Sequence, residues 1–88
     1  MWQVYILECG NGSLYTGITN NLPKRLVSHA SGKGAVYTRT HLPIKLVYSE
    51  VHPSKSSALK REAQIKRLSR LQKASLFLGN SRGKIGLT

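Results

Sequence analysis

The chain has 88 residues, enough for one domain with a modest core, and carries 14 Lys and Arg against three acidic residues. The net charge of +11 favours a polyanionic partner, above all nucleic acid. A single cysteine excludes an intrachain disulfide and a cysteine-rich zinc site. No apolar stretch reaches the roughly 20 residues of a membrane span, and no signal-like segment begins the chain, so a cytoplasmic protein without a membrane partner is expected.

Two short apolar runs at the start of the chain predict a β-hairpin. They span residues 2–9 and 13–19, and Asn11-Gly12 between them is a strong short-range turn signal. Tyr5 lies in the first run and Tyr15 in the second. Both tyrosines are therefore expected to project from one small sheet.

A first helix is predicted from Asn20-Asn21, which can cap it, to Ser31-Gly32, with Pro23 in the first turn. Arg25 and His29 are four residues apart and can reach the same spot on the surface. The buried stripe is predicted from three apolar positions at the same spacing: Leu22, Leu26 and Ala30.

The second half of the chain predicts a third strand and two more helices. The strand covers residues 44–51, and the next helix covers about residues 55–68, capped by Ser54 or Ser56. Ser69 with Gln72 forms a capping box that starts a short helix to about Leu78. We expect a single domain over residues 1–79 and a flexible tail over residues 80–88.

Glu62 lies on the second predicted helix, in an unexpected position. At about 100° per residue it falls between Ala58 and Leu59, within the apolar arc of the helix. A core-facing carboxylate is costly unless a cation or hydrogen bonds meet it. Glu62 can therefore form a salt bridge with Arg25 or Lys66, or it can be a functional carboxylate.

These residue types are those that phosphodiester hydrolysis requires. Glu62 can hold one Mg²⁺ or Mn²⁺ if waters and a substrate phosphate complete the coordination shell. Arg25 offers a planar fork that matches phosphate oxygens. A tyrosine is about one-thousandth ionised at neutral pH, so the proton acceptor is either Tyr15 with a lowered pKa or His29, and the sequence leaves both open.

A glycine-rich loop follows the first predicted helix, and we expect it to lie near the residues proposed for phosphodiester hydrolysis. Loop residues carry function more often than their share, and this loop contains basic, hydroxyl and aromatic side chains. Contacts with nucleic acid are expected from four loop residues and one residue of the second predicted helix: Lys33, Tyr37, Thr38, Arg39 and Lys66.

The motifs of the chain resemble those of the GIY-YIG nucleases. Gln3-Val4-Tyr5 and Tyr15-Thr16-Gly17 match the two halves of the family name. The spacing of the tyrosines, arginine and glutamate is similar to that of the nuclease domain at the start of UvrC. The resemblance covers residues 2–76, and strings typical of small stand-alone bacterial members occur at residues 14–19, 31–35, 37–39 and 61–66.

The resemblance implies a fold and a site. The fold is α+β, a small three-stranded antiparallel sheet flanked by helices, in the order β-β-α-β-α-α. The active site comprises Tyr5, Tyr15, Arg25 and Glu62, and His29 lies one turn after the arginine. The implied activity is metal-dependent endonucleolytic cleavage of DNA, in repair, recombination or foreign-DNA processing.

Some positions depart from the family pattern. Gln3 replaces the first glycine of the motif name, and Ile18 stands where several members have a lysine. The asparagine that many active members carry after the glutamate helix has no clear counterpart. These departures keep a second hypothesis open, a non-catalytic nucleic-acid-binding module with the same fold and charge. A homodimer is a further hypothesis, because a module of this size binds little nucleic acid alone.

Overall fold

The computed structural model, which describes residues 1–33, 40–42 and 44–86, begins with an antiparallel hairpin. Its strands are β1 (Trp2–Glu8) and β2 (Leu14–Thr19). Tyr5 lies opposite Gly17, and Leu7 lies opposite Tyr15. Residues directly opposite each other share a face of the sheet, so the two tyrosines project from one sheet, as predicted, and also from the same face of it.

The hairpin loop is held by local hydrogen bonds. The Cys9 N–H donates to the Ser13 carbonyl at 2.9 Å, and the Gly12 N–H donates to the Cys9 carbonyl at 2.8 Å. The Asn11 side-chain oxygen accepts from the Ser13 N–H at 3.1 Å. Gly12 has a φ of +83°, a left-handed conformation that closes a three-residue loop and that glycine adopts without a steric penalty.

The third strand, β3 (Lys45–His52), pairs antiparallel with the other side of β1, which gives the strand order β2-β1-β3. It starts and ends one residue later than predicted, and Pro43 before it lies outside the described residues. The pairing shifts register between Ile6 and Leu7. β1 is therefore central, and it supplies the largest run of buried side chains.

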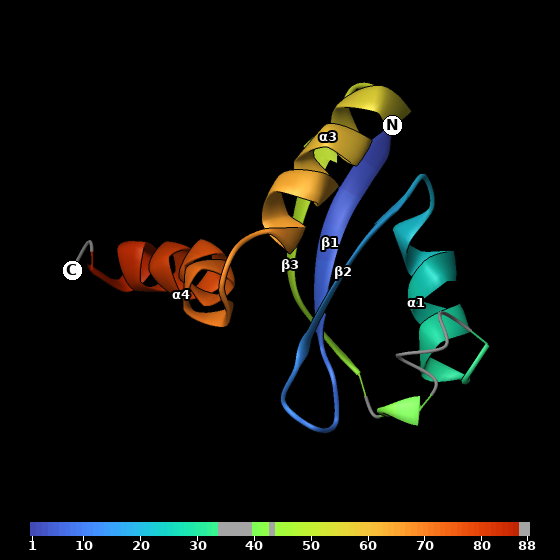
Figure 1. The fold of residues 1–88 in the computed structure, drawn as a ribbon, viewed down its shortest axis with the longest axis horizontal. Coiled ribbons are helices and arrows are strands. Elements are labelled where there is room, and N and C mark those ends of the chain that lie inside the picture. Colours follow the sequence, from blue (N-terminus) through green and yellow to red (C-terminus); the bar gives the residue numbers. More distant parts are fainter. Residues whose placement is uncertain (34–39, 43, 87–88) are drawn as a thin grey trace.

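Helices cover both faces of the sheet. Val4 and Ile6 pack against helix α3 (Lys55–Lys66), whereas Tyr5 and Leu7 face helix α1 (Leu22–Ala30). Figure 1 shows α1 and α3 on opposite sides of the strands. Because side chains alternate along a strand, a central strand covered on both faces reads as a continuous apolar run rather than as an alternating one.

α1 begins as predicted, with the Asn21 side chain accepting from the Lys24 N–H. Its buried face differs from the predicted stripe, because Ala30 is exposed and His29 is fully buried. At 100° per residue, a residue seven positions after Leu22 lies about 20° from it, whereas one eight positions after lies about 80° away. The helix therefore turns His29, not Ala30, toward the sheet.

α3 begins at its predicted start, where the Ser54 side chain accepts from the Ser57 N–H at 3.1 Å. The helix ends at Lys66, two residues before the predicted end. Ala58 and Ile65 are fully buried against the sheet.

The last helix, α4 (Arg70–Gly86), begins with the predicted capping box. The Ser69 N–H donates to Gln72 Oε1, and the Gln72 N–H donates to the Ser69 hydroxyl. The helix continues to Gly86, past the end predicted near Leu78. In Figure 1 it extends to the side of the sheet and away from α1. The flexible tail expected over residues 80–88 stays a prediction, and its last two residues lie outside the described part.

The α+β class and the order of the elements are confirmed. Within the part of the chain that the structure describes, no helix is both long and apolar enough to cross a membrane.

Candidate active site

Two tyrosines and a histidine meet on the α1 face of the sheet. The Tyr5 hydroxyl and His29 Nε2 lie 2.9 Å apart, and both side chains are almost completely buried. The Tyr15 and His29 rings meet edge to face, with centroids 5.5 Å apart. The hairpin register brings the tyrosines side by side, and the inward rotation of α1 adds the histidine.

Gly17 makes room for this cluster. It lies opposite Tyr5 on the neighbouring strand, and a Cβ at this position would be 2.6 Å from the Tyr5 hydroxyl oxygen. The same Cβ would be 3.2 Å from the Tyr15 ring. No side chain larger than that of glycine fits while Tyr5 keeps its orientation, which gives a steric reason for the glycine of the second motif.

Tyr5 is held in its protonated form. Burial raises the pKa of its hydroxyl above the ordinary value of 10.0, and a hydrogen bond with Arg25 opposes this increase. The negative charges that Tyr15 and Glu62 can carry raise the pKa of Tyr5 further. At neutral pH Tyr5 is thus a neutral hydroxyl that can relay a proton.

The pKa of His29 is shifted in the opposite direction. Burial lowers its pKa below the ordinary value of 6.5, and the positive charge of Arg25 lowers it further. The imidazole is therefore neutral at pH 7. In the tautomer that carries its proton on Nδ1, His29 accepts the hydrogen bond from Tyr5 through Nε2.

Arg25 is linked to the cluster by a hydrogen bond with Tyr5 and by its charge, whereas Glu62 is linked to it by charge alone. Arg25 acts on the pKa of both Tyr5 and His29, and Glu62 acts on that of Tyr5. The Glu62 carboxylate is 19% exposed and forms an ion pair with Lys66 at 3.3 Å, so the salt bridge considered from the sequence is present. Glu62 thus lies close enough to Tyr5 for its charge to act on the tyrosine, while its ion pair is with Lys66.

The fit of a divalent ion can be tested on these donors. The described residues contain no group of three or more His, Cys, Asp or Glu side chains that could hold a metal. Mg²⁺ commonly binds through one or two carboxylates, waters and a substrate phosphate, rather than in a cage made only by protein. Glu62 is a hard oxygen donor that is still partly open to solvent. The donor set therefore fits an Mg²⁺ or Mn²⁺ held jointly with substrate.

The structure describes two of the five residues that are predicted to contact nucleic acid. Lys33 is exposed just after α1, where its backbone N–H donates to the Ser28 carbonyl. Lys66 is more than half exposed at the end of α3. The other three, Tyr37, Thr38 and Arg39, lie outside the described residues.

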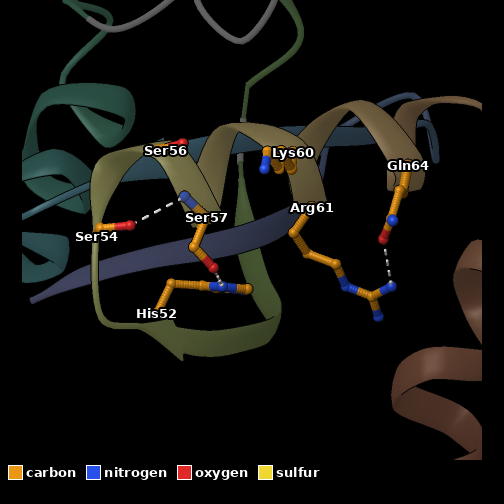
Figure 2. A pocket seen from close by; sticks show the side chains of 7 residues that line it. All are labelled: His52, Ser54, Ser56, Ser57, Lys60, Arg61 and Gln64. Carbon is orange, nitrogen blue, oxygen red and sulfur yellow. Dashed lines mark hydrogen bonds between the residues drawn. The ribbon is translucent and has the colours of Figure 1, made fainter.

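A second polar cluster joins β3 to α3, on the face of the sheet away from His29. Glu50 accepts from the Tyr48 hydroxyl at 2.5 Å and from Arg61 Nε at 2.9 Å, and it lies 2.6 Å from His52 Nε2. Figure 2 shows His52 in contact with Ser57 at the start of α3. Arg61 directly precedes Glu62, so this cluster fixes the rotation of the helix that carries the candidate metal ligand.

The role of Glu50 in joining β3 to α3 was not predicted from the sequence. Burial alone would raise the pKa of Glu50, but the hydrogen bonds from Tyr48, His52 and Arg61 outweigh it and the pKa is lowered. A signal for this cluster was present, because Tyr48, Glu50 and His52 alternate along one strand and must share a face. Only the contact with Arg61 depends on how α3 docks.

The chain is similar to a known protein family. The family model described as the GIY-YIG catalytic domain matches residues 1–75. A UPF0213 protein of Syntrophus aciditrophicus is 55% identical over 78 residues, which are 88% of this chain and 90% of the relative. A UPF0213 protein of Streptococcus sanguinis is 53% identical over 70 residues, 80% of each chain.

Two solution NMR structures share the fold. The UPF0213 protein BH0048 from Bacillus halodurans is 49% identical, with a TM-score of 0.55 over 86% of this chain and 82% of that one. The protein EF2693 from E. faecalis is 38% identical, with a TM-score of 0.57 over 84% of this chain and 80% of that one. The names of these two proteins state no activity.

Proposed function

Because the chain belongs to the GIY-YIG catalytic domain family, we propose that it is a metal-dependent endonuclease that hydrolyses phosphodiester bonds in DNA. Family membership by itself gives a nuclease-type function with a nucleic-acid substrate. The observation that carries the finer proposal is the contact between the Tyr5 hydroxyl and a neutral, buried His29, with Arg25 beside both.

Arg25 and Glu62 are proposed to act on the charge of the substrate. The Arg25 guanidinium binds non-bridging oxygens of the scissile phosphate and stabilises the charge that builds up on them. Glu62 is the proposed ligand of Mg²⁺ or Mn²⁺, and an ion bound there would polarise the phosphate and acidify water. Lys66 forms an ion pair with the Glu62 carboxylate at 3.3 Å.

The proton path follows from the two pKa shifts. Tyr5 is not the final base, because burial raises the pKa of its hydroxyl. We assign that role to His29, whose lowered pKa leaves it neutral and able to accept a proton. As the attacking water forms its bond to phosphorus, its proton passes to the Tyr5 oxygen, and the Tyr5 proton passes to His29 Nε2. The ester P–O bond opposite the water breaks at the same time, and the leaving nucleotide oxygen takes up a proton from solvent. Tyr15, in edge contact with His29, orients the water in this scheme.

The biological setting belongs to the same proposal. DNA repair, recombination or foreign-DNA processing in the cytoplasm fits a small basic nuclease domain. Nothing in the described fold reads as a base-reading module, so the substrate would be selected by shape or single-strandedness. A homodimer would extend the surface available to the substrate, and sedimentation at several protein concentrations tests for it.

The direct test is nicking of labelled single-stranded and duplex DNA with Mg²⁺ or Mn²⁺. Wild-type protein is compared with Glu62→Gln, and Glu8→Gln serves as a control with the same change of charge on another part of the chain. We expect cleavage that needs the metal, vanishes in Glu62→Gln and persists in Glu8→Gln, while DNA binding in EDTA is retained by all three proteins.

Two other results would reject parts of the proposal. Equal cleavage by wild type and Glu62→Gln would indicate a contaminating nuclease and remove Glu62 from the site. Tight binding without cleavage under any metal condition would replace the enzyme with the alternative function, a nucleic-acid-binding module.

A further inference from the structure

A small hollow of about 210 Å³ opens at the free edge of β2, next to the candidate active site. It is lined by residues from β2, α3 and α4: Leu14, Tyr15, Thr16, Lys66 and Lys73. Tyr15 also contacts His29, so this hollow directly adjoins the tyrosine–histidine cluster.

The hollow is positively charged and contains no acidic lining residue. Lys66 lies at the end of α3 and forms an ion pair with the Glu62 carboxylate. Lys73 lies on α4 and is half-buried. Lys73 has no ion pair with any residue that the structure describes. A lysine without a counter-charge that lines a hollow is a favourable partner for an anion.

Thr16 supplies a second, independent indication of a ligand. Its side chain is only 3% exposed, and its hydroxyl oxygen is buried without a hydrogen-bond partner in the described part of the chain. Buried polar atoms are satisfied in most native proteins, and those that are not often mark the place of a water or an ion. An acceptor that reaches Thr16 through the hollow would satisfy its hydroxyl.

We propose that Thr16, Lys66 and Lys73 form a subsite for a backbone phosphate of the nucleic acid, next to the phosphate that is cleaved. The two lysines supply compact positive charges, and the threonine hydroxyl donates a hydrogen bond to a phosphate oxygen. This inference rests on the proposed function, because it takes Tyr15 as part of the cleavage site. The net charge of +11 agrees with a polyanion rather than with a single small anion.

The test measures binding without cleavage. Binding of a short fluorescein-labelled single-stranded DNA is followed by anisotropy in EDTA at several salt concentrations, for wild type, Lys73→Gln, Thr16→Val and a control. The control is Lys60→Gln, which removes the same charge from an exposed lysine of α3 beside the hollow drawn in Figure 2.

For Lys73→Gln we expect weaker binding by about tenfold at low salt, and a salt dependence of binding that is shallower by about 0.7. Lys60→Gln should change both quantities much less. Thr16→Val should weaken binding by about three- to tenfold, because a hydrogen bond to the phosphate is lost. The same substitution should raise the melting temperature of the free protein, since it replaces an unsatisfied buried hydroxyl with a methyl group.

Equal losses of DNA affinity in Lys73→Gln and Lys60→Gln would overturn the proposed subsite. Unchanged DNA affinity of Thr16→Val would also overturn it. These outcomes are separate from the proposed function, which is judged by metal-dependent cleavage in the wild type. Selective loss of binding in a protein that never cleaves would retain the phosphate subsite and reject the nuclease.

Discussion

The Tyr5 hydroxyl occupies the space that a side chain at position 17 would take, 2.6 Å from where a Cβ on Gly17 would stand. Displacing the Tyr5 side chain from such an atom is costly, because the residue is 1% exposed and its hydroxyl is hydrogen-bonded to His29. This pair connects the two motifs sterically as well as through the register of the hairpin.

The first prediction concerns Gly17→Ala. The new methyl group should displace the Tyr5 ring, lower the free energy of unfolding by about 1–3 kcal/mol and strongly reduce cleavage. Denaturant unfolding and single-turnover cleavage measure the two effects. Combining Gly17→Ala with Tyr5→Leu should cost at least about 0.5 kcal/mol less than the sum of the single changes, because the two nearest clashing atoms, the Tyr5 hydroxyl oxygen and Cζ, are both gone. Strict additivity would contradict the contact.

A second prediction separates the relay role of Tyr5 from its packing. Tyr5→Phe keeps the ring but removes the hydroxyl between water and His29, so cleavage should fall by about 10²- to 10⁴-fold. Tyr48→Phe is the matched control, because Tyr48 donates its hydrogen bond to Glu50 on the other face of the sheet, and Glu50 keeps its contact with Arg61 of α3 without it. Its cleavage rate should stay near that of the wild type. A similar loss in both variants would mean that the effect comes from folding.

The third prediction is the pH dependence of cleavage. His29 must be neutral to accept a proton, and its pKa lies below 6.5, so kcat/KM should fall only as the pH drops below that value. The rate should be flat between about pH 7 and 9, because Tyr5 ionises above its ordinary pKa of 10.0. A rate that keeps increasing across this range would indicate a tyrosinate base and contradict the assignment of His29.

The fourth prediction concerns the cluster that fixes α3. Glu50→Gln removes the charge that accepts from Arg61 and Tyr48, and should lower the free energy of unfolding by about 1–3 kcal/mol near neutral pH. The pKa of Glu50 is lowered by folding, so its contribution is present above its ordinary value of 4.5 and is lost as the pH falls through the folded value.

Denaturant unfolding of wild type, Glu50→Gln and Glu8→Gln, measured from neutral pH to below the ordinary Glu pKa of 4.5, checks the prediction. The difference between Glu50→Gln and the wild type should shrink toward low pH, whereas Glu8→Gln should change little. A constant difference at all pH values would show that the ionised form of Glu50 is not what stabilises α3.

The sequence by itself determined the features that depend on neighbours a few residues apart. The turn at Asn11-Gly12, the Asn21 and Ser54 caps and the capping box at Ser69 form as predicted, because each is built from groups within three or four residues of one another. The same hairpin signal put both tyrosines on one small sheet, as predicted.

Only the tertiary structure decided which side chains meet across elements. The rotation of α1 buries His29 in place of Ala30 and brings its ring to a hydroxyl 24 residues earlier in the chain. The docking of α3 joins Arg61 to Glu50, and the placement of α4 brings Lys73 to the edge of β2. Such contacts depend on how helices pack on the sheet, a competition among many weak interactions that no local pattern encodes. The same packing decides whether a hydroxyl such as that of Thr16 is buried without a partner.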